Sequence, residues 1–178
     1  MAHLQTLITP LLPFLILLIT TQTSLAQPTP KPGPNNPAQD FLDLHKEARS
    51  SVGVAPLKWS PPLATSAAHV VAYQKANKNC QFANLSSAAT KYGANQLWAR
   101  GAVVTPRAAV SAWVGEKKYY NYSMDTCIGK HQCGVYKQVV WRKSTELGCA
   151  QASCVKDGST LTVCFYNPPG NIVGEKPY

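Results

Sequence analysis

The sequence has few acidic residues and no uninterrupted apolar run long enough to cross a membrane. Of its 178 residues, 8 are Asp or Glu and 17 are Lys or Arg, which gives a formal net charge of +9. Outside a cell, such a surface favours anionic partners such as acidic wall polysaccharide or lipid headgroups. A cationic surface without a dedicated partner is an equally good interpretation. The basic residues are scattered, so we expect no nucleic-acid binding.

Charged residues are absent from the first 26 positions. An apolar run over residues 11–19 leads to Ser-Leu-Ala at residues 24–26, the small residues that signal peptidase requires. Two prolines interrupt the run, whereas spanning a bilayer takes about 18 consecutive apolar residues. We therefore predict a secretory signal peptide over residues 1–26 and no integral membrane segment.

Cysteine is absent before residue 80, and six cysteines follow it: Cys80, Cys127, Cys133, Cys149, Cys154 and Cys164. An even number behind a secretory signal predicts three disulfides formed in an oxidising compartment. Zinc is the alternative, but the spacing of these cysteines does not supply two close pairs for a four-thiolate site. Spacing alone leaves the pairing open.

Composition divides the mature chain into an arm and one domain. Residues 28–37 carry five prolines in ten, which predicts an extended proline-rich arm over residues 27–38. The mature chain of about 150 residues is long enough for a single core. We therefore place one domain at residues 39–178.

Apolar spacing predicts helices in the first part of the domain and strands in the last. Helices are expected over residues 39–52 and 61–78 and after Thr105-Pro106, with a long loop over 84–104 around a short element near 93–98. Strands are expected over residues 134–143, 145–153 and 160–167. This order is typical of an α+β fold in which helices cover an antiparallel sheet.

Several motifs occur in order along the domain, namely LHKEARSSVGVAPLKW, KYGANQLWA, WVGEKKYYNY, CGVYKQVVW, LGCAQASC and VCFYNPPGNIVGEKPY. In this order they resemble the CAP superfamily (SCP domain), and more closely plant pathogenesis-related protein 1. KYGANQLW and CGVY look most like its pistil-expressed branch. The resemblance implies a three-layer α–β–α sandwich with a central antiparallel sheet. It also implies the disulfides Cys80–Cys154, Cys127–Cys133 and Cys149–Cys164.

Family members carry two histidines and two glutamates in a central cleft, which can hold a divalent metal. Three of these four positions hold Asn84, Ala94 and Val135 in this sequence, and only Glu116 matches. One carboxylate without an imidazole makes a poor metal site and a poor acid–base pair. We therefore predict no catalytic residue, no metal and no cofactor.

We expect a residual cleft with a structural role, formed by Asn84, Asn95, Glu116, Tyr136 and Gln138. Asn95 and Glu116 could hydrogen-bond across it, and Tyr136 and Gln138 could point toward it. Of the histidines in the mature chain, His45 and His69 are expected in the core or at its boundary. His131 lies in a short disulfide loop.

The resemblance also implies that Tyr119, Tyr120 and Tyr122 belong to a sterol-binding loop, because a ring offers apolar area with a polar tip. The alternative is that these tyrosines pack a helix end onto the sheet. Asn84 and Asn121 begin glycosylation sequons. The C-terminal segment 168–178 resembles a peptide that the family can release, or it is a tail held by the neighbouring disulfide.

We predict a secreted, monomeric, non-enzymatic plant defence protein of the apoplast or cell wall. It would bind a sterol or lipid, act against microbes and protect outer tissues such as the pistil. A hydrolase is disfavoured because no G-x-S-x-G motif occurs and no acid is paired with a histidine. The alternatives are a cationic protein held to wall polysaccharide and the precursor of a C-terminal signalling peptide.

Overall fold

A computed structural model of the chain describes residues 36–85, 91–101, 104–155 and 158–178. The predicted signal peptide and most of the predicted arm lie outside the described residues. No described helix is long and apolar enough to span a bilayer. In chain order the elements are α1 (Pro37–Ser50), β1 (Lys58–Trp59), α2 (Pro61–Asn77), β2 (Gly93–Arg100), α4 (Pro106–Gly115), the 3-10 helix η1 (Glu116–Tyr119), β3 (Tyr120–Asn121), β4 (Thr126–Cys127), α5 (Gly134–Val139), β5 (Glu146–Cys154) and β6 (Ser159–Asn167).

Two helices begin where a capping side chain precedes a proline. Asn36 caps α1 by accepting a hydrogen bond from the Ala38 amide at 3.2 Å, and Pro37 occupies the first helical position. Thr105 caps α4 in the same way through the Ala108 amide at 3.1 Å. The start predicted for α4 is therefore correct, whereas α1 begins inside the segment assigned to the arm.

The main sheet has four strands in the order β1-β5-β6-β2. β6 runs antiparallel to both of its neighbours, β5 and β2. β1 pairs in parallel with β5, through Lys58 opposite Glu146. The central sheet is thus antiparallel as predicted, with one short parallel pair at its edge.

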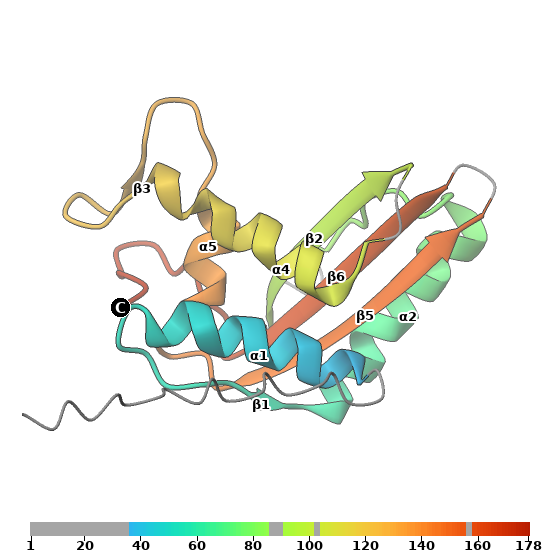
Figure 1. Ribbon diagram of the computed structural model, residues 1–178, viewed down its shortest axis with the longest axis horizontal. Coiled ribbons are helices and arrows are strands. Elements are labelled where there is room, and N and C mark those ends of the chain that lie inside the picture. The colour runs from blue at the N-terminus through green and yellow to red at the C-terminus, as the bar shows by residue number, and fades with distance from the viewer. Residues whose placement is uncertain (1–35, 86–90, 102–103, 156–157) are drawn as a thin grey trace, which may run out of the picture. The chain divides into compact units, whose positions relative to one another are not determined.

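Helices cover both faces of this sheet (Figure 1). α2 packs on one face, where it shares a core with Leu161, Val163 and Phe165 of β6. α1, α4 and α5 cover the other face, where Cys164 and Tyr166 are buried. Because successive side chains of a strand point to opposite faces, β6 contributes to both cores. The predicted three-layer α–β–α sandwich is confirmed.

The three predicted disulfides are present as Cys80–Cys154, Cys127–Cys133 and Cys149–Cys164. Cys149–Cys164 joins residues that lie directly opposite each other on β5 and β6. Cys80–Cys154 ties the segment after α2 to the end of β5. A disulfide of this kind typically stabilises a fold by about 2–4 kcal/mol.

The prediction of a strand over residues 134–143 is wrong, because this segment forms helix α5 and the turn that follows. Tyr136, Val139 and Val140 recur at helical spacing and are all buried in the core beneath α1 and α4. Burial of this helical face outweighs the preference of Val and Tyr for strands. The short element expected near residues 93–98 is the strand β2.

A buried arginine joins α1 to the turn after α5. The Arg49 guanidinium donates to the carbonyls of Ala55, Val139, Trp141 and Ser144, at distances from 2.6 to 3.2 Å. Burial lowers the pKa of Arg49 to about 10, so the side chain stays charged at neutral pH. The guanidinium thus fixes the backbone at the end of α5 and in the turn that follows it.

Candidate functional site

A central cleft lies between β2, α5 and the C-terminal tail, defined as residues 168–178, and has a volume of about 500 Å³. Ala94 and Gln96 of β2 line one side, Val135 and Gln138 of α5 line the other, and Gly170 of the tail completes the wall. Two positions that carry metal-binding side chains in the family therefore face this cleft. In this chain both present apolar groups.

Glu116 begins η1 and turns its carboxylate toward the start of α5. It accepts hydrogen bonds from the amides of Val135 and Tyr136, while its Oε2 is buried without a partner. Burial raises the pKa of Glu116, and the two amide bonds oppose this rise. A carboxylate at this place offsets the unpaired amides of a helix start. One part of the Glu116 carboxylate therefore faces the α5 backbone, and Oε2 is left without a partner.

Asn95 of β2 approaches the same turn of α5 from the other side. Its amide nitrogen donates to the Val135 carbonyl at 2.9 Å and to the Tyr166 hydroxyl at 3.2 Å. The Asn95 Oδ1 atom is buried without a partner, as is the free oxygen of Glu116. The expected hydrogen bond between Asn95 and Glu116 is therefore absent, because each side chain binds the α5 backbone instead.

The hydrogen-bond chain continues from Tyr166 into the core beneath α1. His45 accepts from the Tyr166 hydroxyl through Nε2 at 2.8 Å and donates through Nδ1 to the Phe41 carbonyl at 2.7 Å. Burial lowers the pKa of His45 to about 4, so its imidazole is neutral at physiological pH. The prediction of a satisfied core histidine is confirmed for His45. His69, in contrast, is exposed on α2.

Gln138 and Tyr136 of α5 were both expected to point toward the cleft, and only Gln138 lines it. The Gln138 side chain donates to the Ser144 hydroxyl at 3.2 Å and accepts from the Gly170 amide at 2.9 Å, which ties the tail to α5. Tyr136 is buried, and its hydroxyl lies 3.3 Å from the hydroxyl of Tyr178. Residues two apart on a helix point in different directions, so Gln138 faces the cleft whereas Tyr136 faces Tyr178.

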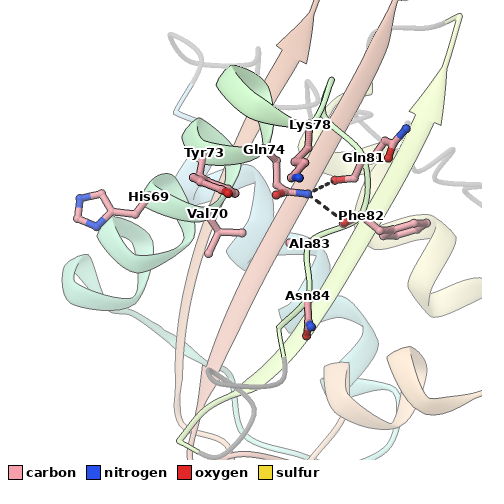
Figure 2. Close-up of a pocket in the computed structure, with 9 residues that line it drawn as sticks. All are labelled: His69, Val70, Tyr73, Gln74, Lys78, Gln81, Phe82, Ala83 and Asn84. Atoms are coloured by element: carbon pink, nitrogen blue, oxygen red, sulfur yellow. Dashed lines mark hydrogen bonds between the residues drawn. The ribbon is translucent and has the colours of Figure 1, made fainter.

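A second hollow, of about 560 Å³, lies between α2 and the segment that follows it (Figure 2). Tyr73 and Phe82 line it with 58% and 57% of their surfaces exposed. The Gln74 amide holds the segment in place by donating to the carbonyls of Gln81 and Phe82. Asn84 lines this hollow and is exposed. Of the five residues of the expected cleft, only Gln138 lines the central cleft, and Asn84 lines the second hollow although its neighbour Leu85 lines the central cleft.

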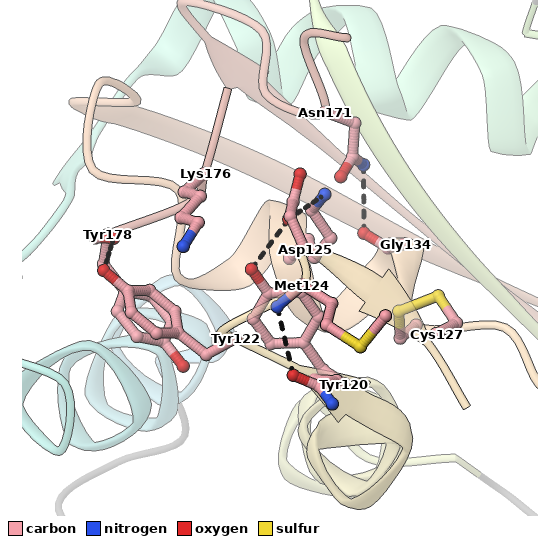
Figure 3. A network of polar contacts seen from close by, with 12 residues as sticks. Tyr120, Tyr122, Met124, Asp125, Cys127, Gly134, Asn171, Lys176 and Tyr178 are labelled. Carbon is pink, nitrogen blue, oxygen red and sulfur yellow. Dashed lines mark hydrogen bonds and ion pairs between the residues drawn. A yellow bond between two sulfur atoms is a disulfide. The ribbon is translucent and has the colours of Figure 1, made fainter. Parts of the chain in front are cut away.

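The three tyrosines of the predicted sterol loop have different surroundings. Tyr119 stacks on His131 with ring centroids 3.8 Å apart. Tyr120 is half-buried and donates its hydroxyl to Asp125 at 2.8 Å (Figure 3). Tyr122 is exposed, and its ring stacks on that of Tyr178 at 4.8 Å. Tyr120 also packs against the core cluster, in line with the alternative that these tyrosines pack a helix end onto the sheet. The ring partners of Tyr119 and Tyr122 are instead His131 and Tyr178.

Sequence reasoning missed two other residues of this loop and the last residue of the chain. Met124 and Ile128 expose 70% and 52% of their surfaces in the same loop. Both are apolar and lie outside any helical or strand pattern, so the sequence alone could have indicated that they are exposed. The role of Tyr178 has no local signal, because its partners lie far away in the sequence.

The residues present do not fit the metal site of the family. Within the described parts of the chain, no three His, Cys, Asp or Glu side chains lie close enough together to hold a metal ion. Ala94 and Val135 offer no lone pair, and Glu116 is turned toward backbone amides. All six cysteines are paired.

Comparison with known proteins relates this chain to one family. The model of the cysteine-rich secretory protein family, CAP, matches residues 42–166. The STS14 protein of Solanum tuberosum is 62% identical over 141 residues, which cover 79% of this chain and 65% of that protein. The chain therefore spans slightly less than two thirds of the length of the potato protein.

Other relatives agree with this assignment. Pathogenesis-related protein 1C of Nicotiana tabacum is 41% identical over 143 residues, which cover 80% of this chain and 82% of that protein. Among solved structures, Schistosoma mansoni venom allergen-like protein 4 has a TM-score of 0.61 at 27% identity, covering 82% of this chain and 95% of that one. Both the sequence and the fold thus match the same family.

Proposed function

This chain belongs to the CAP family of cysteine-rich secretory proteins and, within it, to the plant pathogenesis-related 1 proteins, and from this premise we propose that it is a secreted, non-enzymatic defence protein. Its three disulfides suit an oxidising extracellular compartment such as the apoplast. The described residues that line its central cleft include no Asp, Glu, His or Lys that could form an acid–base pair. The motifs KYGANQLW and CGVY support a place in outer tissues such as the pistil.

A loop with exposed apolar side chains carries the proposal that the ligand is a sterol or another lipid. Tyr122, Met124 and Ile128 expose 44%, 70% and 52% of their surfaces within one loop. The disulfide Cys127–Cys133 closes this loop against the start of α5. Exposed apolar side chains that cluster in this way are typical of a binding surface. Removing sterol from a microbial membrane through this loop would account for antimicrobial action.

Equilibrium binding of radiolabelled ergosterol to the purified protein tests this proposal. We expect saturable binding by the wild-type chain and at least about tenfold weaker binding by the double variant Met124→Ser, Ile128→Ser, since burying one such side chain contributes about 1.5–3 kcal/mol. Val155→Ser is the matched control, because Val155 is 93% exposed but lies in the turn after β5. Absence of saturable uptake by the wild-type protein would end the proposal.

Asn84 is the better of the two predicted glycan acceptors. It is exposed, whereas Asn121 is half-buried in β3 and accepts a hydrogen bond from the Met124 amide at 3.2 Å. Intact-mass measurement before and after enzymatic deglycosylation should show one glycan, lost in Asn84→Gln and retained in Asn121→Gln. The opposite pattern would contradict this assignment.

The net charge of +9 favours a second function, attachment to anionic wall polysaccharide, which is compatible with the first. Release of the C-terminal tail as a signalling peptide is a further alternative. Cleavage after Asn167 would have to act on a residue whose carbonyl accepts from the Thr145 amide and whose side chain donates to Glu146. Release therefore requires local opening at the end of β6.

A further inference from the structure

Tyr178 lies among the three tyrosines Tyr120, Tyr122 and Tyr136, which we call the aromatic cradle. Figure 3 shows Tyr120, Tyr122 and Tyr178. The Tyr178 ring stacks on Tyr122 with centroids 4.8 Å apart and an interplanar angle of 9°, and it meets the edge of Tyr120 at 6.4 Å. The Tyr122 hydroxyl donates to the Tyr178 carbonyl oxygen at 2.7 Å. Tyr178 thus covers aromatic surface of the loop proposed above to bind sterol.

The two residues before Tyr178 also contact the rest of the domain and hold the tail in place. The Arg142 amide donates to the Pro177 carbonyl at 2.7 Å. The Lys176 ammonium lies 4.6 Å from the centre of the Tyr122 ring and donates to the Ser123 carbonyl at 3.2 Å. Tail and loop are therefore joined by several specific contacts, which indicates a defined docked state.

These contacts are of a kind that can open without unfolding the core. The hydrogen bond between Tyr122 and Tyr178 and that between Lys176 and Ser123 are both exposed to solvent. Solvent-exposed contacts have lower opening free energies than the core elements. Tyr178 also packs against the core cluster, so opening of the tail exposes part of that cluster. The tail can therefore leave the cradle while the disulfide-linked sheet stays intact.

The shape and polarity of Tyr178 indicate what else the cradle accepts. Its side chain is a flat apolar ring that ends in a hydroxyl, and this hydroxyl lies 3.3 Å from that of Tyr136. A sterol is likewise a flat apolar body with a single hydroxyl at one end. It could place its ring face on Tyr122 and its hydroxyl near Tyr136, in the position that Tyr178 occupies.

We propose that Tyr178 is an autoinhibitory plug, and that displacement or removal of the C-terminal residues opens the aromatic cradle to the ring system of a sterol. This inference rests on the proposed sterol binding and adds its regulation. The wild-type chain binds sterol weakly, through the exposed Met124 and Ile128. A chain without the plug binds it through the cradle as well.

Ergosterol binding to three variants tests the plug. Tyr178→Ala should bind radiolabelled ergosterol several-fold more tightly than the wild-type protein, because the stacked ring that competes for the cradle is removed. Tyr178→Phe keeps the stacked ring and should stay close to wild type. Tyr73→Ala removes another exposed tyrosine, on α2, and should leave the affinity unchanged.

A second variant tests the position of the ligand hydroxyl. Adding Tyr136→Phe to Tyr178→Ala should reverse at least half of the gain in binding free energy, because a hydrogen-bond partner in the cradle is lost. Near-UV circular dichroism should show altered tyrosine signals in Tyr178→Ala, and unchanged far-UV signals would show that the fold is intact.

The outcomes separate this inference from the function on which it rests. Equal, saturable affinities of wild type and Tyr178→Ala would overturn the plug and leave sterol binding in place. Absence of saturable binding in both proteins would overturn sterol binding and the plug together. Equal gains in Tyr178→Ala and Tyr73→Ala would also overturn the plug, because the effect would not depend on the cradle.

Discussion

At the scale of single residues, one directed chain of hydrogen bonds lies beneath the central cleft. Asn95 donates to Tyr166, Tyr166 donates to His45, and His45 donates to the Phe41 carbonyl. The direction of every hydrogen bond in this chain is fixed, because the Phe41 carbonyl can only accept and His45 must therefore donate to it through Nδ1. His45 is therefore fully occupied in its neutral form and cannot exchange a proton with a ligand in the cleft.

Acid should destabilise the fold through His45. Burial lowers its pKa to about 4, from an ordinary value of 6.5. The unfolded chain therefore binds more protons between these two values, so stability is complete above the higher one and falls as the pH drops toward the lower one. We expect this group to remove about 3 kcal/mol across the window. Urea unfolding of the wild type and His45→Gln at several pH values measures the effect.

The glutamine variant is the control for other titrating groups, since it can keep both hydrogen bonds without taking up a proton. Its unfolding free energy should depend on pH less strongly than that of the wild type over the same window. Identical pH dependence in the two proteins would show that His45 does not carry the effect.

The cleft should also fail to bind zinc. Ala94 and Val135 supply no ligand atoms, and Glu116 is occupied by two amides. Isothermal titration of zinc into the protein at neutral pH should therefore show only the heat of dilution. A stoichiometric transition at micromolar zinc would contradict this, and loss of that transition in Glu116→Gln would locate it at the cleft.

At the scale of elements, α2 lies unusually close to β5. A side-chain carbon at Gly148 would overlap the backbone of Leu63 and Ala64, at the start of α2. Neither backbone can move aside easily, because Ala64 is held in the first turn of the helix and Gly148 is paired with Phe165 of β6. The absence of a side chain at this position sets the distance between the two layers.

Gly148→Ala should therefore lower the free energy of unfolding by about 3 kcal/mol or more, at the upper end of the range for overpacked cores. Gly115→Ala is the matched control, because open space surrounds that position at the end of α4. The control should be neutral or slightly stabilising, since alanine favours helix over glycine. Equal unfolding midpoints of the two variants in urea would contradict the close approach.

The family resemblance was sufficient to predict the layers and the disulfides, and Ser60-Pro61 and Thr105-Pro106 were sufficient to predict the starts of α2 and α4. The start of α1 at Asn36-Pro37 was missed, because these residues were assigned to the arm. The sequence was not sufficient for α5, where Val, Tyr and Trp suggest a strand and where burial of Tyr136, Val139 and Val140 decides for a helix. Within the cleft, the apolar character of Ala94 and Val135 could be predicted. The orientation of Glu116 and the docking of Tyr178 could not, because both depend on partners far away in the chain.

At the scale of the whole molecule, the surface charge and the apolar loop serve different kinds of contact. The net charge of +9 acts over distances of about 8 Å at physiological ionic strength. The exposed side chains of Met124 and Ile128 act only on contact. Charge can therefore hold the protein at an anionic surface while the loop that carries Met124 and Ile128 remains available to contact a ligand.

Retention on immobilised polygalacturonate should accordingly depend on salt. We expect binding at low ionic strength and elution as salt rises, because exposed charges are screened. Immobilised dextran, which is uncharged, should not retain the protein. Retention on polygalacturonate that persists at high salt would point to a specific site instead of the net charge.

The strand order has a consequence for how the protein is made. β1 and β2 come early in the chain, yet both are edge strands that pair only with β5 and β6, the last two strands to be synthesised. A nascent chain emerging from the ribosome can therefore pair the short β3 and β4, but it cannot assemble its four-stranded sheet until almost all of it has been translated. The main sheet is acquired only after the final strand arrives, which is compatible with passage through a protein-conducting channel before that sheet forms.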